Sequence, residues 1–454
     1  MDKPRQPWTT GLTGYHWFVF LVASAAWFFD CLDQRLFSLA RNPALTALMP
    51  GVEPGVVQAT GKEVTAVFLI GWGIGGLIFG ALGDRYGRAR MLTLTVLIYS
   101  IFTGLTFFSR AYWDFALFRF LTGVGVGGVF GLAVALIAES LPDSARTGAL
   151  GMLQVLSTIG NIAAAFFNIL IDWLQGSGYI QPGEGWRYMF LVGAIPSLLV
   201  IATGRYLHEP EPWLRAKEEG TLPKGSIFAP YRALVGDHTW RKNLVIGALL
   251  ASTGVIGLWA IAEYAVDIQK LVFKAYFVAE YGTSISPEEI NSKVTRAITI
   301  AYVLNMLGAG VGMWIFTKLA QWYGRRPAFA AGFIAAMLTT ALVYWKMNSP
   351  WDAYWMMPLM GAAQLSVFAG FAIYLPELFP SRLRSTGTSF CYNLGRFAAA
   401  GGSFFSAALA TQAFGQFGSP LKERYAAIAM CSIFLVGLAT LPFAPETKDK
   451  PLPE

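Results

Sequence analysis

Charged side chains are scarce in this sequence, because Asp, Glu, Lys and Arg make up only 13% of its 454 residues. A soluble domain carries about 25%, so this chain cannot cover a water-facing surface, which argues against a soluble enzyme. Hydrophobic residues make up 55% and fall into runs of roughly 18 to 25 residues, long enough for a helix to cross a hydrocarbon core of about 30 Å. Backbone amides must be paired in lipid, and such runs are too long for barrel strands. The sequence therefore predicts an all-α membrane protein.

Histidine and cysteine are also scarce, with three of each. The cysteines lie far apart inside apolar runs, in neither a disulfide nor a metal-ligand pattern, and the histidines lie away from the middle of any run. The sequence has no phosphate-binding loop that ends in Lys-Ser or Lys-Thr. We therefore expect no metal, no cofactor, no ATP-driven step and no enzyme activity.

The formal net charge of +7 does not indicate a nucleic-acid partner. Lys and Arg concentrate in the polar segments between apolar runs, where they would meet anionic lipid headgroups. Membrane lipid is therefore the expected partner of these charges.

Apolar runs and polar breaks predict twelve membrane helices, six on each side of a polar central segment. Their predicted ranges are 16–40, 63–83, 91–108, 115–138, 147–173 and 187–207, then 243–267, 296–318, 328–346, 352–375, 387–413 and 424–443. We expect an N-terminal six-helix bundle in 1–207, a cytoplasmic linker in 208–242 and a C-terminal six-helix bundle in 243–454. Residues 268–295 are expected to form a loop.

The two halves repeat one another in sequence. The second helix is followed by Leu82-Gly83-Asp84-Arg85-Tyr86-Gly87-Arg88, and the eighth by Leu319-Ala320-Gln321-Trp322-Tyr323-Gly324-Arg325. The fourth and tenth helices are each followed by a glutamate seven residues before an arginine, namely Glu139 and Arg146, then Glu377 and Arg384. The offsets are 237 residues (324 minus 87) and 238 residues (377 minus 139). A duplicated six-helix unit is the prediction, and such parallel repeats build transporters with a midplane site.

Two motifs carry a family resemblance. Gly80-x-Leu82-Gly83-Asp84-Arg85-x-Gly87-Arg88 resembles the loop signature of the major facilitator superfamily, and Arg119-x-x-x-Gly123-x-Gly125-x-Gly127-Gly128 resembles its fourth-helix motif. The resemblance implies a transporter whose glycines let helices approach closely and whose loop charges form ion pairs that hold the halves in one state. Because the second copy has Thr317 and Gln321 in place of the glycine and the acid, we expect these ion pairs to be asymmetric.

Within that superfamily, Asp30-x-x-Asp33 is similar to the Asp-Gly-x-Asp pattern of aromatic-acid and sialate/lactate proton symporters, although Cys31 departs from it. Trp186-Arg187 is also similar to those symporters. Glu209-Pro210 and Pro445-Glu446-Thr447 are similar to segments of sugar porters. Both subfamilies therefore stay open.

Asp30 is expected near the bilayer centre, with Asp33 on nearly the same face of the first helix. A charge at that depth costs roughly 2.5 to 3.5 kcal/mol, which makes it a functional candidate. Burial and a neighbouring like charge both favour a protonated carboxyl, so we predict that Asp30, Asp33 and Arg119 couple transport to protons. The alternative is that Arg35 and Arg119 neutralise the two acids structurally.

Arg396 is expected about ten residues into the eleventh helix, where a guanidinium can bind a carboxylate through two N–H groups. The alternative is an internal ion pair with Glu263 or Asp267. Further candidates for substrate contact are polar side chains in apolar runs, which should face a cavity or a neighbouring helix. They are Gln154, Asn161, Glu263, Asn305, Gln364 and Asn393.

The resemblance and these residues together imply a secondary active transporter that carries a small organic anion, a carboxylate, with protons by alternating access. A sugar porter, in which Arg396 is structural and Gln154 and Asn161 contact hydroxyls, is one alternative, and a non-transporting membrane sensor is another. We expect a monomer in the inner membrane that binds its small-molecule substrate, protons and lipid, and no nucleic acid. Because the arginines make the motif loops basic, both termini are expected in the cytoplasm.

Overall fold

The structure is a computed structural model that describes residues 7–282, 284–400 and 408–453 and, within them, omits the side chains of residues 201, 202, 262–264, 398 and 400. Every regular element in these ranges is a helix. The chain forms two compact units. The first comprises Met1–Ala248, Ala372–Phe397 and Asp449–Glu454, and the second comprises Leu249–Phe371 and Ala398–Lys448.

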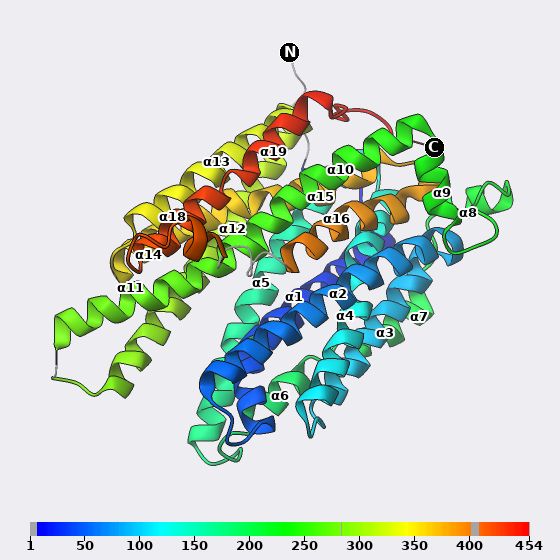
Figure 1. Cartoon of the computed structure of the whole chain (residues 1–454). Helices are drawn as coiled ribbons and strands as arrows, with labels where there is room; N and C mark the ends of the chain where they lie inside the picture. Colours follow the sequence, from blue (N-terminus) through cyan, green and yellow to red (C-terminus); the bar gives the residue numbers. More distant parts are fainter. Residues whose placement is uncertain (1–6, 283, 401–407, 454) are drawn as a thin grey trace. The chain divides into compact units, whose positions relative to one another are not determined.

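The first unit contains long helices, α1 to α5, followed by shorter ones, α6 to α9 (Figure 1). Its helices are α1 (Gly14–Leu48), α2 (Pro54–Tyr86), α3 (Arg88–Thr106), α4 (Tyr112–Ser140), α5 (Asp143–Gly176), α6 (Gly185–Val192), α7 (Ser197–Tyr206), α8 (Glu211–Glu218), α9 (Ala229–Gly236) and the start of α10 (His238–Ile256). It also includes most of α16 (Arg384–Ala400) and two short 3₁₀ helices, Leu375–Leu378 and Ser381–Leu383.

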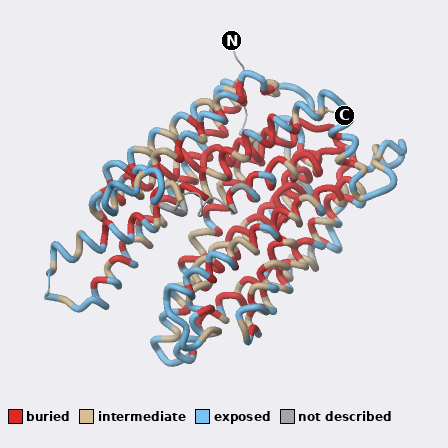
Figure 2. Tube along the Cα trace, in the orientation of Figure 1, coloured by how far each residue is buried: buried red, intermediate tan, exposed pale blue. Residues whose placement is uncertain are grey.

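Close packing of α4 against α2 and α3 forms the core of this unit. Figure 2 shows α4 buried along most of its length. A Cβ atom at Gly127 would lie 2.1 Å from the carbonyl oxygen of Trp72, and one at Gly75 would lie 2.0 Å from that of Val124. Only glycine allows backbones to approach this closely, so the glycines of the fourth-helix motif are packing residues.

The segment predicted as a linker is folded onto the first unit. Trp213 of α8 is 2% exposed, and its Nε1 donates a hydrogen bond of 2.8 Å to the carbonyl oxygen of Asp84. The hydroxyl of Tyr231 on α9 donates one of 2.7 Å to the carbonyl oxygen of Leu77. Both short helices are therefore tied to the end of α2.

The second unit contains the rest of α10 and the helices that follow it. They are a π-helical turn (Gly257–Ala262), α11 (Glu263–Tyr281), α12 (Pro287–Trp322), α13 (Arg325–Lys346), α14 (Pro350–Gln364), α15 (Ser366–Tyr374), a second π-helical turn (Leu409–Ala413), α18 (Leu421–Met430), α19 (Ile433–Thr440) and a 3₁₀ turn (Leu441–Phe443). The end of α15 belongs to the first unit.

The prediction of a loop over 268–295 is wrong, since most of that segment is helical. α11 continues to Tyr281, and α12 begins at Pro287. Ser286 caps α12, because its hydroxyl accepts from the N–H of Glu289 and the Glu289 carboxylate accepts from the N–H of Ser286. The helices therefore extend beyond the predicted spans, and Gly282, Ser284 and Ser286 between them are exposed.

Eleven spans in the described residues are long and apolar enough to cross a membrane. Each contains or overlaps one of the twelve predicted spans. The remaining prediction, 387–413, includes residues outside the described ranges. The prediction of an all-α membrane protein is thus confirmed.

Candidate functional site

Asp33, on the buried face of α1, forms an ion pair with α4. Its Oδ2 lies 3.5 Å from Nη1 of Arg119, and its Oδ1 accepts a hydrogen bond of 2.9 Å from the hydroxyl of Thr103 on α3. Nη2 of Arg119 donates to the hydroxyls of Thr106 and Thr122 at 2.7 and 3.0 Å. Both charged side chains are fully buried. Such a pair tolerates burial because each charge compensates the other, and the loss of either charge is costly.

Asp30, one helical turn earlier on α1, has different neighbours. Its Oδ1 accepts a hydrogen bond of 3.3 Å from Gln34, whereas its Oδ2 is buried and has no hydrogen-bond partner in the described part of the chain. Arg396 is a basic group that interacts electrostatically with Asp30. The two predicted coupling acids are therefore not equivalent, since Arg119 is the partner of Asp33.

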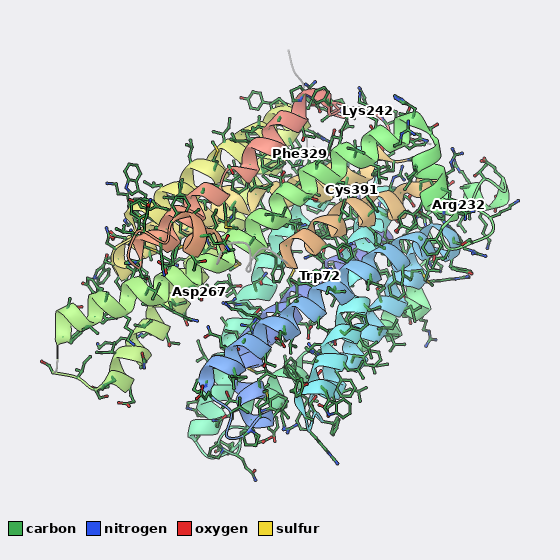
Figure 3. The ribbon with its side chains drawn as sticks, in the orientation of Figure 1. Trp72, Arg232, Lys242, Asp267, Phe329 and Cys391 are labelled. Carbon is green, nitrogen blue, oxygen red and sulfur yellow. The ribbon has the colours of Figure 1, made fainter. Side chains whose placement is uncertain are left out.

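Arg396 lies on α16 and is 2% exposed. Its guanidinium carbon lies 3.4 Å from the ring centroid of Trp72 on α2 and 4.8 Å from that of Tyr392. Figure 3 labels Trp72 and, on α16, Cys391. Nε of Arg396 donates a hydrogen bond of 3.2 Å to Oδ1 of Asn393. Nη1 is buried without a hydrogen-bond partner among the described residues. The cation is thus held in place by rings, with one donor nitrogen left for another acceptor.

Aromatic side chains form a wall beside this arginine. The rings of Phe130 and Tyr392 stack at 3.7 Å, and the Trp27 ring lies 5.1 Å from that of Phe130. Nε1 of Trp27 donates a hydrogen bond of 3.0 Å to Oε1 of Gln154. This bond orients the amide and leaves its buried Nε2 without a partner in the described residues. The sequence did not lead us to predict this aromatic wall. Tyr392 nevertheless precedes Arg396 by four residues and so lies on the same face of the helix.

The remaining polar candidates mainly bond to backbone. Nδ2 of Asn393 donates to a carbonyl of its own helix at 2.8 Å, so its oxygen is the atom that holds Arg396. Asn161 donates to a carbonyl of α5 at 3.1 Å. In the second unit, Asn305 and Gln364 each donate to a backbone carbonyl at 2.8 Å. The side chain of Glu263 lies outside the described ones. Substrate contact by these residues stays a prediction.

Four loop-motif residues, called the motif cluster below, form a buried network in the first unit. Nε of Arg88 lies 3.0 Å from Oε2 of Glu139, and Nη1 of Arg384 lies 2.6 Å from Oε1 of Glu139. Asp84 lies 3.0 Å from Arg88 and accepts hydrogen bonds from the N–H and the hydroxyl of Thr386 at 2.8 and 2.5 Å. Glu139 and Arg384, 245 residues apart in sequence, are thereby joined by an ion pair, and Asp84 and Thr386, 302 residues apart, by hydrogen bonds.

The two copies of the second motif, at Arg146 and Arg384, also make equivalent contacts in the structure. Nε of Arg146 and Nε of Arg384 each donate a hydrogen bond of 3.0 Å to the carbonyl oxygen eight residues earlier. Arg146 also pairs with Asp143 at the exposed start of α5. Glu377 is 8% exposed. Arg85, in contrast, binds the linker, where it donates to the carbonyl oxygen of Gly225.

The two copies of the first motif each lead into the start of a helix, at Gly87 before α3 and at Gly324 before α13. Gly87 and Gly324 have φ angles of 112° and 107°, which glycine adopts without strain. The carboxylate of Glu209 accepts from the first N–H groups of α3 at 3.2 and 3.0 Å, and that of Glu446 accepts from those of α13, including Arg325, at 2.8 and 3.0 Å. Burial acts to raise the pKa of Glu446, but hydrogen bonds from four backbone N–H groups outweigh it and lower the pKa. Nη1 of Arg325 also donates to a carbonyl of α12 at 2.8 Å.

Comparison with curated proteins gives several transporters. A protein of Haemophilus influenzae named as a metabolite transporter is 27% identical over 98% of this chain and 100% of its own. A protein of Cupriavidus pinatubonensis named as a 4-methylmuconolactone transporter is 28% identical over 84% of this chain and 81% of its own. The cis,cis-muconate transport protein of Acinetobacter baylyi is 26% identical over 84% of each chain.

Comparison with solved structures shows the same fold. The proton:xylose symporter XylE superposes with a TM-score of 0.72 at 20% identity, over 96% of this chain and 98% of its own. A human organic anion transporter superposes with a TM-score of 0.69 at 16% identity, over 94% of this chain and 99% of its own. The sequence profile of the Major Facilitator Superfamily matches residues 17–403. The chain therefore belongs to the Major Facilitator Superfamily and is a multi-pass membrane transporter rather than an enzyme.

Proposed function

We propose that this secondary transporter carries a small organic anion together with a proton, and that the carboxylate of the anion binds Arg396. The observation that carries the proposal is the state of this guanidinium. It is 2% exposed, it lies against the Trp72 ring, and its Nη1 has no hydrogen-bond partner among the described residues. A buried donor without an acceptor is costly, and a carboxylate supplies both an acceptor and the compensating charge.

Asp30 supports the coupling to protons. While Asp30 is ionised it compensates the charge of Arg396, and a substrate carboxylate would then add a second negative charge to a buried site. A proton on Asp30 removes that competing charge and leaves Arg396 to the substrate. The proton and the anion therefore bind best together, so one monoanion enters with at least one proton.

The aromatic wall supports a planar acid. Rings of Trp27, Trp72, Phe130 and Tyr392 border Arg396 or one another. Flat unsaturated groups stack on such rings at low cost. The amide Nε2 of Gln154 is positioned to meet a second polar group of the substrate. Relatives named for muconate and benzoate transport agree with this substrate class.

We further propose that two six-helix bundles, 1–207 and 243–454, alternate in access around this site while the motif cluster opens and closes. We also propose that the basic motif loops and both termini face the cytoplasm and that the membrane is the inner membrane. Nothing in the proposed cycle requires a second copy of the chain, so the functional unit is a monomer.

Uptake into proteoliposomes with an imposed pH gradient tests the proposal. Benzoate, cis,cis-muconate and sialic acid serve as substrates, with xylose as a neutral competitor. We expect one of the acids to accumulate, a protonophore to abolish its accumulation, and xylose not to compete. Competition by xylose alone would instead favour the sugar porter.

Two variants test the assigned roles. Arg396→Lys keeps the charge but loses the fork of donors, so substrate affinity should fall more than thermal stability. Arg424→Lys is the matched control, because this buried guanidinium donates to the carbonyl oxygens of Trp345 and Met347 and should affect stability alone. Asp30→Asn imitates the protonated acid, so binding should lose its pH dependence. If Asp30→Asn accumulates substrate as the parent does, the role of Asp30 is wrong.

A further inference from the structure

The two carboxylates of α1 lie in separate environments. Asp33 is compensated by Arg119, while Asp30 interacts electrostatically with Arg396. Each is fully buried. If both take part in coupling, a proton must pass between them without bulk water, which requires a group that donates and accepts a proton at the same time.

Tyr99 of α3 is placed for this role by the register of two helices. α1 and α3 run in the same direction, because α2 alone separates them with short connections. The hydroxyl of Thr103 meets Asp33 at 2.9 Å. Tyr99 lies one helical turn before Thr103, just as Asp30 lies one turn before Asp33, so Tyr99 and Asp30 are at the same level.

The phenol of Tyr99 has the properties that such a group needs. Tyr99 is fully buried, and its hydroxyl has no hydrogen-bond partner in the described part of the chain. It interacts electrostatically with both Asp30 and Asp33. An unpartnered buried hydroxyl is costly, so its place on α3, at the level of Asp30 and one turn from the contact with Asp33, calls for a function.

The charged and titratable groups around this phenol form a short set. α1 contributes Asp30, Cys31 and Asp33, and the neighbouring hydroxyl on α3 is that of Ser100. Beyond the acids, Arg119 of α4 forms an ion pair with Asp33, and Arg396 of α16 interacts electrostatically with Asp30. Of the two acids that act on the phenol, Asp33 is therefore paired with Arg119, and Asp30 interacts with Arg396.

We propose that Tyr99 transfers the coupling proton between Asp33 and Asp30. The phenol oxygen accepts the proton from the carboxyl of one aspartate while its own O–H proton passes to the carboxylate of the other. One O–H bond of the phenol breaks as another forms, so the phenol is regenerated and one proton has moved. The transfer restores the Asp33–Arg119 ion pair at the moment when Arg396 becomes available to the substrate. This inference rests on the proposed proton coupling.

Tyr99→Phe tests the transfer, because it keeps the buried ring and removes only the hydroxyl. Exchange of labelled for unlabelled substrate takes place while the transporter carries both substrate and proton. This exchange needs no proton transfer between the two aspartates, so Tyr99→Phe should retain it. Net accumulation driven by a pH gradient needs the transfer and should fall about tenfold or more. Tyr344→Phe is the matched control, since this buried hydroxyl donates to the carbonyl oxygen of Ile261 and should leave both activities unchanged.

The outcomes separate the inference from the proposed function. If the parent protein accumulates an acid and loses it with a protonophore, but Tyr99→Phe accumulates as well as the parent, the relay is refuted and the symport stands. If the parent ignores the protonophore, both are refuted. Should Tyr99→Phe fail to fold, 3-fluorotyrosine at position 99 keeps the shape and makes the phenol more acidic. The pH profile of accumulation should then shift, and an unshifted profile overturns the relay.

Discussion

Glu139→Gln should open the motif cluster. Oε1 of Glu139 lies 2.6 Å from Nη1 of Arg384, and Oε2 lies 3.0 Å from Nε of Arg88. All three side chains are at most 1% exposed. Glutamine keeps the shape but not the charge, so Arg384 loses its anionic partner. Removing one partner of a buried ion pair costs about 3 to 5 kcal/mol. Since 1.4 kcal/mol is about a factor of ten, the open population should rise at least ~100-fold.

Cys391 supplies the assay for this change. It is fully buried and lies seven residues after Arg384, which places it two helical turns along the same side of α16. In a protein whose other two cysteines, Cys31 and Cys431, are alanine, the rate of alkylation by N-ethylmaleimide reports how often α16 becomes accessible. When opening and closing are fast, this rate follows the open population. Glu139→Gln should therefore speed alkylation at least ~100-fold.

Asp143→Asn is the control for this experiment. It removes the charge of an ion pair with Arg146 whose carboxylate is 73% exposed, and exposed pairs contribute little. Its alkylation rate should equal that of the parent. If Glu139→Gln is folded and is also alkylated at the parent rate, the motif cluster does not hold the first unit closed.

Three further outcomes follow from the geometry. Gly87→Ala should lower stability by about 1 to 3 kcal/mol, because φ is 112° and the new Cβ would lie 2.2 Å from Glu209, and an unchanged melting temperature would contradict this. The parent should lose thermal stability as pH falls from 4.5, the ordinary pKa of glutamate, through the lowered pKa of Glu446, and Glu446→Gln should flatten that part of the melting profile. Trp72→Leu removes a cation–π contact of about 2 kcal/mol with Arg396 and should weaken substrate binding by about 30-fold in a titration.

Helix existence was predictable, but helix length was not. An apolar run marks the part of a helix that contacts lipid. It does not show how far the helix continues beyond the lipid. α11 continues to Tyr281 through a segment that is interrupted by Gln269, Lys270, Lys274 and Glu280. α12 begins at Pro287, because the capping box of Ser286 and Glu289 satisfies its first N–H groups. The capping signal is present in the sequence, and hydrophobicity alone overlooks it.

The charged members of the site were predictable because charge in an apolar run is rare. Their pairing was not, since it depends on the rotation of each helix. A separation of three residues turns a helix by about 300°, so Asp30 and Asp33 differ by about 60° in direction and meet different helices. The ring of Trp72 was unpredictable for another reason. An aromatic residue that lines a site and one that packs in a core have the same local sequence.

The two halves of the chain contain a third matched pair of residues, Arg187 and Arg424, which we did not recognise from the sequence. Arg187 donates to the carbonyl oxygens of Phe107 and Ser109 at the end of α3. Arg424 donates to those of Trp345 and Met347 at the end of α13. The two arginines are 237 residues apart (424 minus 187), which is the offset of the glycine motif. Both copies therefore use an arginine to satisfy the carbonyls that a helix end leaves unpaired.

Asp33, Arg119 and Arg396 of the candidate site do not repeat in this way, whereas Asp30 corresponds to Asp267 at an offset of 237 residues (267 minus 30). At an offset of 237 or 238 residues, Arg119 corresponds to Met356 or Met357, and at 238 residues Arg396 corresponds to Thr158. The pairs that do repeat act on backbone groups at helix ends, where every copy of the fold has the same unpaired atoms. A buried charge has no such general partner and is tolerated only where a specific counter-charge or ligand meets it. Duplication of the six-helix unit therefore explains the contacts at helix ends that both copies share. Function explains the charges that are present in one copy alone.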